Sequence, residues 1–326
     1  MKIGIVGYGN VGKGVEQAIK LNPDTELFAV YTRRDPSTIS LDTNGVPVLP
    51  MSALGSRVGG PDVLIMCGGS ASDLPVMTPQ YASRFCVVDS FDTHAKIPEH
   101  FAAVDKAAKK GKTTAVISAG WDPGLFSLAR AYMLASVSSG KSYTFWGRGV
   151  SQGHSDAVRR IEGVADARQY TVPIEESVAA VRSGEMPELD NRHKHLRECY
   201  VVAKDGADRD EITRKIVTMP NYFDEYDTTV TFITQEEMDR DHKEMPHGGS
   251  VIRTGDANIG KTHRSVMEFK LDLDSNPEFT GGVLLACARA AYKLHARGMS
   301  GAFTMLDIAP ADLLPLTHDE LLHKLV

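Results

Sequence analysis

Short apolar runs alternate with longer amphipathic stretches over the first 125 residues of the chain. Runs of four or five mostly apolar residues bounded by turn residues predict buried strands, and the stretches between them predict helices. An alternation of this kind predicts a doubly wound, Rossmann-type parallel sheet. The predicted strands cover residues 3–6, 27–30, 63–66, 86–89 and 114–118, with a short strand around Val46. The predicted helices follow the first strand and cover residues 51–57, 75–84 and a segment with apolar positions at Phe101, Val104 and Ala108.

From residue 126 onward, apolar and polar residues alternate within several segments. A period of two is typical of antiparallel strands that have one buried and one solvated face. We therefore expect an α+β substrate-binding and dimerisation domain with a mixed or antiparallel sheet at residues 126–282. Its predicted strands cover residues 142–146, 170–172, 198–203, 228–233, 249–253 and 266–273, and its predicted helices cover 126–133, 175–182 and 208–218.

The C-terminal residues 283–326 are expected to complete the first domain, residues 1–125. They contain an Ala- and Leu-rich segment at 283–297 that predicts a helix. A strand at 303–308 and a closing helix at 320–326 follow it.

A glycine-rich turn lies between the first predicted strand and the first predicted helix. Gly7, Gly9 and Gly12 have the G-x-G-x-x-G spacing, in which glycines allow a tight turn, close approach of a pyrophosphate and close helix packing. The free amides and the positive dipole end of the next helix favour phosphates. A glycine-rich turn without a ligand is the alternative, but the flanking strand and helix favour a dinucleotide-binding domain. The residues expected to contact the cofactor here are Gly7, Tyr8, Gly9, Asn10, Val11 and Gly12.

The end of the second predicted strand indicates which dinucleotide is bound. An acidic residue at this distance from the glycines would hold the ribose 2′-hydroxyl of NAD. The strand ends instead in Thr32, Arg33 and Arg34, and guanidinium groups bind a 2′-phosphate through charged hydrogen bonds. Asp35 argues for NAD but lies one residue farther on, so NADP is the predicted cofactor. A loop of small residues, expected beneath the ribose and nicotinamide, comprises Cys67, Gly68, Gly69 and Ser70.

Composition and charge exclude several other classes of protein. The 326 residues are 42% hydrophobic and carry a formal net charge of −6, which argues against a nucleic-acid partner. The first predicted strand starts at residue 2, and no apolar run approaches the ~20 residues of a membrane span, so we expect a cytoplasmic protein without a signal peptide or membrane partner. The scattered cysteines, the absence of a zinc-type His pair and the absence of G-x-S-x-G argue against a metal site, a disulfide framework and a serine hydrolase.

Polar clusters bounded by glycine, proline or aromatic residues occur at 89–92, 120–124, 145–156 and 245–249. Each cluster alone is equally well explained by a turn or a packed core. Together with the N-terminal motifs, they resemble the NADP-dependent meso-diaminopimelate D-dehydrogenase family over essentially the whole chain. The motifs that carry the resemblance are V-G-Y-G-N-V-G, T-R-R, C-G-G-S, G-W-D-P-G, T-F-W-G, S-Q-G-H-S-D-A-V-R-R-I and M-P-H-G-G.

The resemblance implies a reversible, NADP-dependent oxidative deamination at the D-centre of meso-2,6-diaminopimelate. The products would be L-2-amino-6-oxopimelate (L-tetrahydrodipicolinate) and ammonium, in lysine biosynthesis, and the enzyme would be a homodimer. By the same resemblance, Asp92, Asp122 and Asp156 surround the reacting D-amino group. The residues that shape this end are Trp121, Trp146, Gln152 and Gly153, and those that hold the L-centre are Thr171, Arg197, His247 and Asn276.

Several alternatives stay open at this point. The general base that assists hydrolysis of the imine is one of Asp92, Asp122 and His154. Pattern alone would favour a surface ion pair for Arg197 and a helix or turn cap for Asn276. Two other functions are another NADP oxidoreductase acting on an aldehyde or sugar, and a non-catalytic NADPH-binding regulator. A sugar enzyme would more often offer a Lys and His pair in these loops, and a regulator would not need three carboxylates and a paired anion site.

Overall fold

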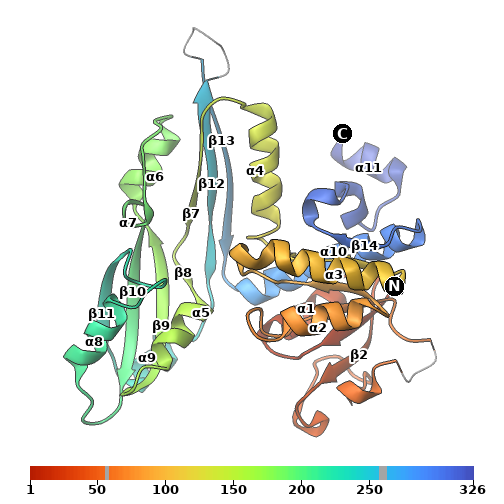
Figure 1. Cartoon of the computed structure of the whole chain (residues 1–326), viewed down its shortest axis with the longest axis horizontal. Coiled ribbons are helices and arrows are strands. Elements are labelled where there is room, and N and C mark those ends of the chain that lie inside the picture. The colour runs from red at the N-terminus through yellow and green to blue at the C-terminus, as the bar shows by residue number, and fades with distance from the viewer. Residues whose placement is uncertain (56–58, 257–262) are drawn as a thin grey trace. The chain divides into compact units, whose positions relative to one another are not determined.

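The computed structural model of the chain describes residues 1–55, 59–256 and 263–326. The chain divides into two compact units, whose elements are labelled in Figure 1. The first unit comprises Met1–Leu128 and Pro277–Val326, and the second comprises Ala129–Asn276.

Seven parallel strands in the described part of the chain form the sheet of the first unit, in the order β14-β6-β5-β4-β1-β2-β3. The chain starts at β1, adds β2 and β3 on one side, and then adds the remaining strands on the other. This confirms the predicted doubly wound sheet, and the strand order reverses beside β1, where such folds bind ligands. The strands are β1 (Lys2–Val6), β2 (Glu26–Thr32), β3 (Val48–Pro50), β4 (Val63–Met66), β5 (Cys86–Asp89), β6 (Thr114–Val116) and β14 (Gly301–Phe303).

Successive side chains of these strands enter two separate apolar cores, one on each face of the sheet. On β4, Val63 and Ile65 belong to one core, and Leu64 and Met66 belong to the other. All four side chains are fully buried. A strand that is buried on both faces reads as a continuous apolar run, which is why β4 could be predicted from the sequence.

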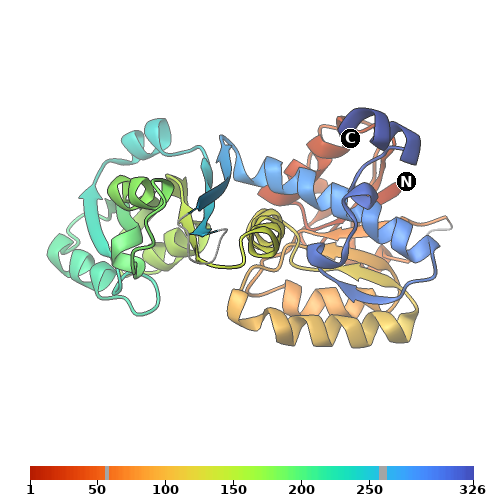
Figure 2. The ribbon, with the colours of Figure 1, turned by 90° about the horizontal axis from the view of Figure 1, so that it is seen from above.

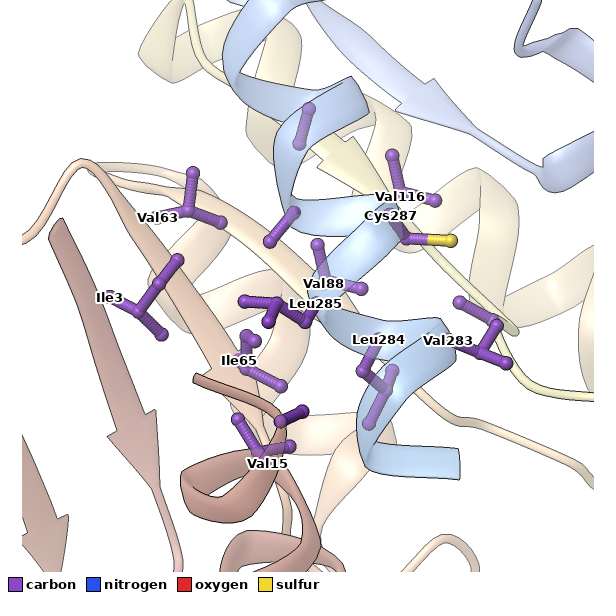
Figure 3. Close-up of a cluster of buried hydrophobic side chains, with 14 of the residues drawn as sticks. Ile3, Val15, Val63, Ile65, Val88, Val116, Val283, Leu284, Leu285 and Cys287 are labelled. Carbon is purple, nitrogen blue, oxygen red and sulfur yellow. The ribbon is translucent and has the colours of Figure 1, made fainter. Parts of the chain in front are cut away.

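Helices cover both faces of this sheet (Figure 2). Apolar residues of α1 and α10 belong to one core, and those of α2 and α3 belong to the other. Figure 3 shows Leu284 and Leu285 of α10 among Ile65 and Val88 of the sheet. Each fully buried side chain of this kind contributes about 1.5–3 kcal/mol through the hydrophobic effect. The helices are α1 (Asn10–Lys20), α2 (Leu74–Ala82), α3 (Ile97–Gly111), α10 (Asn276–Ala296) and α11 (His318–Leu325), and α4 (Leu125–Ser136) continues into the second unit.

The helix α10 begins at Asn276, well before the start predicted at residue 283. The sequence pattern did not predict residues 276–282 as helix, because this segment contains the adjacent glycines Gly281 and Gly282 and glycine is a poor helix former. Gly281 is nevertheless required there, because a Cβ at that position would overlap the backbone of Gly14 on α1. Close packing of two helices therefore overrides the local propensity.

Three other predicted elements differ from the structure. The strand predicted at 303–308 ends at Phe303, because Thr304 caps a 3₁₀ helix at Met305–Asp307. The short strand expected around Val46 lies slightly later, at β3. The helix predicted at 51–57 is a 3₁₀ helix at residues 51–53, and its positions 56 and 57 lie outside the described residues.

The second unit has the predicted α+β character, but its strands divide between two sheets. One sheet has the order β11-β10-β9-β8 and the other has the order β13-β12-β7. β10 and β11 pair in parallel, because α8 lies in the connection that joins them. The strands are β7 (Lys141–Trp146), β8 (Gly149–Val150), β9 (Val164–Pro173), β10 (His195–Ala203), β11 (Asp227–Phe232), β12 (His247–Asp256) and β13 (Arg264–Leu273).

Short helices accompany these two sheets. α5 and α8 pack on the four-stranded sheet, where Val158 and Ile212 enter its apolar core. α6 packs on the three-stranded sheet through Val178 and Val181. The helices are α5 (Gln152–Arg159), α6 (Glu175–Arg182), α7 (Asn191–Lys194), α8 (Arg209–Val217) and α9 (Gln235–Asp241). Across the described ranges of both units, no helix is both long and apolar enough to cross a bilayer.

Candidate active site

The glycine loop joins β1 to α1 at the carboxyl edge of the parallel sheet. Gly7 has a φ of +90°, and a Cβ there would lie 3.1 Å from the carbonyl oxygen of Cys67. A Cβ at Gly12 would lie 2.5 Å from the carbonyl oxygen of Gly7. A Cβ at Gly9, in contrast, would meet no atom within 4 Å. The missing side chain of Gly9 therefore leaves open space at the N-terminus of α1, which fits the pyrophosphate of a dinucleotide.

A buried carboxylate ties the tip of this loop to α1. The hydroxyl of Tyr8 donates to Glu16, whose carboxylate also accepts from the backbone N–H of Thr43 at 2.6 Å. Burial raises the pKa of Glu16, but these hydrogen bonds outweigh burial and leave the pKa below its ordinary value. Burial and the Glu16 carboxylate raise the pKa of Tyr8. Asn10 and Val11 form the first turn of α1, so all six predicted residues lie on one short segment.

The arginines predicted to select NADP lie at the carboxyl end of β2. The guanidinium of Arg34 donates to the carbonyl oxygen of Tyr8, so it lies against the glycine loop. Arg33 pairs with Asp73 at 2.7 Å, and its side chain is 65% exposed. Thr32 is buried, and its hydroxyl accepts from the backbone N–H of Arg34 at 3.0 Å. A cationic group thus stands where a dinucleotide fold positions the adenine ribose.

Asp35, the residue that would favour NAD, forms a local helix cap. Its carboxylate accepts from the backbone N–H of Ser37 at 3.0 Å and from the Ser37 hydroxyl at 2.8 Å. These hydrogen bonds lower the pKa of Asp35. Its carboxylate is therefore already engaged at the start of the 3₁₀ helix Pro36–Thr38.

The loops that follow β4 and β5 are joined by hydrogen bonds. In the Cys67–Ser70 loop, the Ser70 hydroxyl lies 2.5 Å from the Asp92 carboxylate and accepts from the Asp92 backbone N–H at 3.0 Å. The backbone N–H of Gly69 donates to Asp73 at 2.9 Å. The structure thus brings Asp92, a predicted catalytic residue, together with the loop predicted to lie beneath the cofactor.

Trp121 and Asp122 lie in the loop between β6 and α4. Trp121 is buried, and its ring packs edge-on against Phe126 at 5.2 Å. A β-bridge between Trp121 and Gly124 closes the loop around Asp122. Because β5 and β6 are neighbours in the sheet, the loops that carry Asp92 and Asp122 lie side by side.

In the second unit, a row of residues crosses three strands, and a histidine of β12 lies beside the end of that row. Arg197 on β10 lies opposite Thr171 on β9, which lies opposite Gly149 on β8. The guanidinium of Arg197 donates to the Thr171 hydroxyl. A Cβ at Gly149 would lie 2.6 Å from the ring of His247, so this imidazole occupies the space beside the glycine. Three of the four residues predicted for the L-centre are therefore brought together.

Arg197 is a buried cation. Its residue is 5% exposed, and its guanidinium lies over the ring of Tyr226 at 4.0 Å. In the described ranges of the chain, no carboxylate forms an ion pair with it, and its Nε is buried without a hydrogen-bond partner. Burial lowers the pKa of Arg197, and Tyr226 compensates only in part. A buried charge normally requires an opposite charge, so this position fits an anionic group of a ligand.

Trp146 is held by a histidine that the sequence reasoning did not identify. The backbone N–H of Trp146 donates to Nε2 of His195 at 2.8 Å, and the two rings stack at 5.1 Å. Because Nε2 accepts, the ring proton lies on Nδ1. Burial and the charge of Arg197 lower the pKa of His195 to about 3, which keeps the imidazole neutral. No signal in the sequence pointed to His195, because the predicted strand began at residue 198 whereas β10 begins at His195 and places His195 and Arg197 on one face.

His154 lies at the start of α5, where Ser151 is the N-cap residue. Its Nδ1 is 2.7 Å from the Ser151 hydroxyl, and its ring packs edge-on against Phe223 at 5.6 Å. Burial and the charge of Arg197 lower the pKa of His154 to about 3. An efficient general base has a pKa near the operating pH, so this environment argues against His154 in that role.

Two other predicted residues lie on the exposed side of α5. Asp156 is exposed and pairs with Arg159 of the same helix. Gly153 is also exposed, and a Cβ there would meet no atom within 4 Å. Both belong to the second unit, whereas Asp92 and Asp122 belong to the first.

The loop before β12 gathers the remaining predicted residues. Met245 accepts from the side-chain amide of Gln152 through its sulfur at 3.0 Å, and its carbonyl oxygen accepts from the backbone N–H of Asn276 at 3.0 Å. The backbone N–H of Gly248 donates to Nδ1 of His247 at 2.8 Å. Gln152, His247 and Asn276 therefore meet around one loop.

The parallel sheet and the glycine loop define a dinucleotide-binding protein. The sequence model of the diaminopimelic acid dehydrogenase C-terminal domain matches residues 120–275. The meso-diaminopimelate D-dehydrogenase of Ureibacillus thermosphaericus is 54% identical over 326 residues, which cover 100% of this chain and 99% of the relative. The chain therefore belongs to the meso-diaminopimelate D-dehydrogenase family, and it is an amino acid dehydrogenase.

Two solved structures agree with this family assignment. The Corynebacterium glutamicum diaminopimelate dehydrogenase in complex with diaminopimelate is 42% identical, with a TM-score of 0.92 and coverage of 100% of this chain and 99% of that one. An engineered D-amino acid dehydrogenase bound to NADP⁺ is 41% identical, with a TM-score of 0.88 and the same coverage.

Proposed function

We propose that this protein catalyses the reversible, NADP-dependent oxidative deamination of the D-centre of meso-2,6-diaminopimelate. The products are L-2-amino-6-oxopimelate (L-tetrahydrodipicolinate) and ammonium, and the reaction belongs to lysine biosynthesis. The single observation that carries the proposal is the buried guanidinium of Arg197, which has no carboxylate partner in the described part of the chain. An enzyme for a dicarboxylate needs such a position at the end of the substrate that does not react.

The distant L-centre is held by Arg197, Thr171, His247 and Asn276. The Thr171 hydroxyl oxygen accepts from Arg197 and from the amide of Gln169 at 3.5 Å. Because both neighbours donate to this oxygen, its own hydrogen is available for a ligand carboxylate. A guanidinium and a hydroxyl together bind one carboxylate through charge-assisted hydrogen bonds.

The reacting D-centre is bound by Asp92, Asp122 and Asp156, with Trp121, Trp146, Gln152 and Gly153 shaping this end. Carboxylates stabilise both the substrate ammonium and the iminium that develops from it. A bound nicotinamide would supply the acceptor for the hydride that leaves the D-α-carbon. Water then adds to the substrate imine and ammonia leaves, which requires a general base. Asp92, Asp122 and His154 are the candidates for this base, and the lowered pKa of His154 argues against His154.

NADP, rather than NAD, is the proposed cofactor. Thr32, Arg33 and Arg34 hold the 2′-phosphate, and the contact of Arg34 with the glycine loop supports this role. The glycine loop and the small residues Cys67, Gly68, Gly69 and Ser70 hold the rest of the dinucleotide. We also propose that the enzyme works in the cytoplasm as a homodimer, with the second unit forming the dimer contact, as is suggested by the family resemblance.

The test is a comparison of diaminopimelate stereoisomers with purified protein. We expect NADP⁺ to be reduced with the meso isomer but not with the LL isomer, because only the meso isomer presents both a D-centre and an L-centre. NAD⁺ should support a much lower rate. Equal rates with the LL isomer, or no rate with any isomer, would contradict the proposal.

A further inference from the structure

A buried carboxylate links the two loops that carry the proposed catalytic residues of the first unit. Asp89 is the last residue of β5 and is fully buried. Its Oδ1 accepts from the backbone N–H of Phe91 at 3.1 Å and from the backbone N–H of Ser118 at 2.9 Å. Phe91 immediately precedes Asp92, and Ser118 begins the segment that leads to Asp122. One oxygen atom therefore holds the starts of both loops.

His100 on α3 orients this carboxylate. Its Nε2 lies 2.7 Å from Oδ2 of Asp89. The imidazole ring also stacks on Phe91, with ring centroids 4.3 Å apart and an interplanar angle of 29°. Because Oδ2 is held by His100, Oδ1 stays directed at the two backbone N–H groups. The helix α3 thus supports both loops through the contacts of His100 with Asp89 and Phe91.

The conformation of the second loop depends on this contact. Ser118 has a φ of +53°, which is uncommon for a residue with a Cβ. The backbone N–H of Ala119 also donates to the carbonyl oxygen of Asp89 at 2.9 Å. On the other side, Ser70 holds the carboxylate of Asp92. A continuous set of hydrogen bonds therefore crosses the carboxyl ends of β6, β5 and β4.

We propose that Asp89 and His100 are positioning residues that hold Asp92 and Asp122 at the separation that the reacting centre requires. This inference rests on the proposed roles of those two carboxylates. Asp89 and His100 are 0% and 5% exposed, so they act through the loops and not through contact with substrate. Their loss should lower turnover much more than cofactor affinity, because they reach the proposed cofactor-binding residues only indirectly, through Asp92 and Ser70.

Three substitutions test the proposal. Asp89→Asn keeps the shape of the side chain but replaces the carboxylate with an amide. His100→Leu removes both the N–H donor and the ring, whereas His100→Gln keeps an N–H donor near the position of Nε2. We expect kcat with meso-diaminopimelate to fall about tenfold to a hundredfold in Asp89→Asn and His100→Leu, because small misplacements of catalytic groups have effects of this size. His100→Gln should recover much of the rate. The Kd of NADP⁺, measured by fluorescence titration, should change much less than kcat in all three variants.

Asp105→Asn is the matched structural control. Asp105 also lies on α3 and accepts a backbone N–H, from Ala302 on β14 at 3.1 Å. This variant should lose thermal stability without any change in kcat per folded protein, with the folded fraction measured by circular dichroism. The proposal is wrong if Asp89→Asn and His100→Leu have the same kcat as Asp105→Asn. It is also wrong if His100→Gln is as slow as His100→Leu. In either case, Asp89 and His100 only stabilise the fold. If Asp89→Asn does not fold, the two His100 variants decide.

Asp92→Ala and Asp122→Ala separate this inference from the proposed function. If both variants keep near-normal turnover, the assignment of the reacting centre fails, and the positioning role fails with it. If they are nearly inactive while the Asp89 and His100 variants keep full turnover, only the positioning role is overturned.

Discussion

The two units present their proposed binding residues in different ways. In the first unit, the cofactor loop is mainly backbone, and its central feature is the space that a missing side chain leaves at Gly9. In the second unit, the site is made of side chains on neighbouring strands, and its central feature is the buried charge of Arg197. One surface therefore offers main-chain donors to a phosphate, and the other offers a cation to a carboxylate.

This difference suggests that the first unit recognises the cofactor and the second unit recognises the substrate. A loop of backbone N–H groups binds the pyrophosphate that nicotinamide dinucleotides share. A buried guanidinium without a carboxylate partner discriminates strongly, because a substrate that lacks the matching carboxylate leaves its charge uncompensated. We therefore expect the second unit to determine which amino acid is oxidised, and the first to determine which cofactor is used.

Removing a carboxylate at the reacting centre should have the largest effect. Asp92→Ala or Asp122→Ala should lower kcat/KM for meso-diaminopimelate about 10²–10⁴-fold, the range typical of general acid–base groups. The Kd of NADPH should change little, because neither residue belongs to the glycine loop. Asp35→Ala is the control, since Asp35 only caps a 3₁₀ helix. Near-normal turnover in both variants would show that the D-centre has been assigned wrongly.

Replacing the buried cation should change specificity as well as rate. Arg197→Met should weaken use of meso-diaminopimelate by about 1.5–3 kcal/mol, the value of a charged hydrogen bond. Activity on D-alanine or D-leucine should fall less or even rise, because these substrates have no distant carboxylate. Steady-state kinetics would measure the ratio of kcat/KM for meso-diaminopimelate to kcat/KM for D-alanine or D-leucine.

Arg253→Met provides the matched control for Arg197. Arg253 is also buried in the second unit, but its guanidinium is satisfied by Val137, Ser138 and Ser142. Its loss should lower stability without changing the ratio of the two substrates. If both arginine variants change the ratio equally, or neither does, Arg197 does not determine specificity.

The cofactor arginines should differ from each other. Arg34→Gln should weaken NADP binding by about 1.5–3 kcal/mol, and Arg33→Gln should weaken it less, because Arg33 is exposed and already paired with Asp73. The double variant should bind NADP and NAD with more similar affinities. Isothermal titration with both cofactors measures these changes, and the exposed Arg84→Gln serves as the control. An unaltered ratio of NADP to NAD affinity in the double variant would refute the assignment.

Filling the space at Gly149 should disturb only the second unit. Gly149→Ala places a Cβ 2.6 Å from the ring of His247 and 2.7 Å from its Cα, and the displacement of this residue should lower kcat/KM on the order of tenfold. Cofactor affinity should not change. Gly282→Ala is the control, because a Cβ there meets no atom within 4 Å. Equal behaviour of the two variants would mean that His247 has room to move without loss.

The smallest expected effect is the pH dependence of stability that comes from Glu16. Its pKa in the folded protein is below the ordinary value of 4.5. Its contribution to stability is therefore fully present above that pH and is lost as the pH falls through the folded pKa. Thermal unfolding of Glu16→Gln should depend less on acid than that of the parent, whereas exposed Glu99→Gln should behave like the parent. An identical acid dependence of Glu16→Gln and the parent would contradict this role.

The sequence pattern was sufficient to predict the bounds of a strand or helix where the pattern lies entirely within that segment. The strands at residues 63–66 and 86–89 and the helix at 175–182 have the predicted bounds, because their apolar pattern is uninterrupted and turn residues flank it. Only the first residue of the strand predicted at 303–308 lies in a strand, because a capping threonine and an aspartate favoured a 3₁₀ helix at Met305–Asp307. Side-chain hydrogen bonds to the backbone thus overrode an apolar run.

Spacing along the chain by itself determined the glycine loop, the arginines after β2 and the parallel sheet that presents them. These features depend on neighbours in sequence, and their physical requirements, a positive φ or an apolar run, can be read residue by residue. Only the tertiary structure decided that Asp89 joins two loops, that His195 supports Trp146, that Gly149 makes room for His247, and that Arg197 is buried without a carboxylate in the described ranges. The role of each of these residues depends on a partner from a distant segment. Whether a side chain is buried, and which charges surround it, is determined only when those segments pack together.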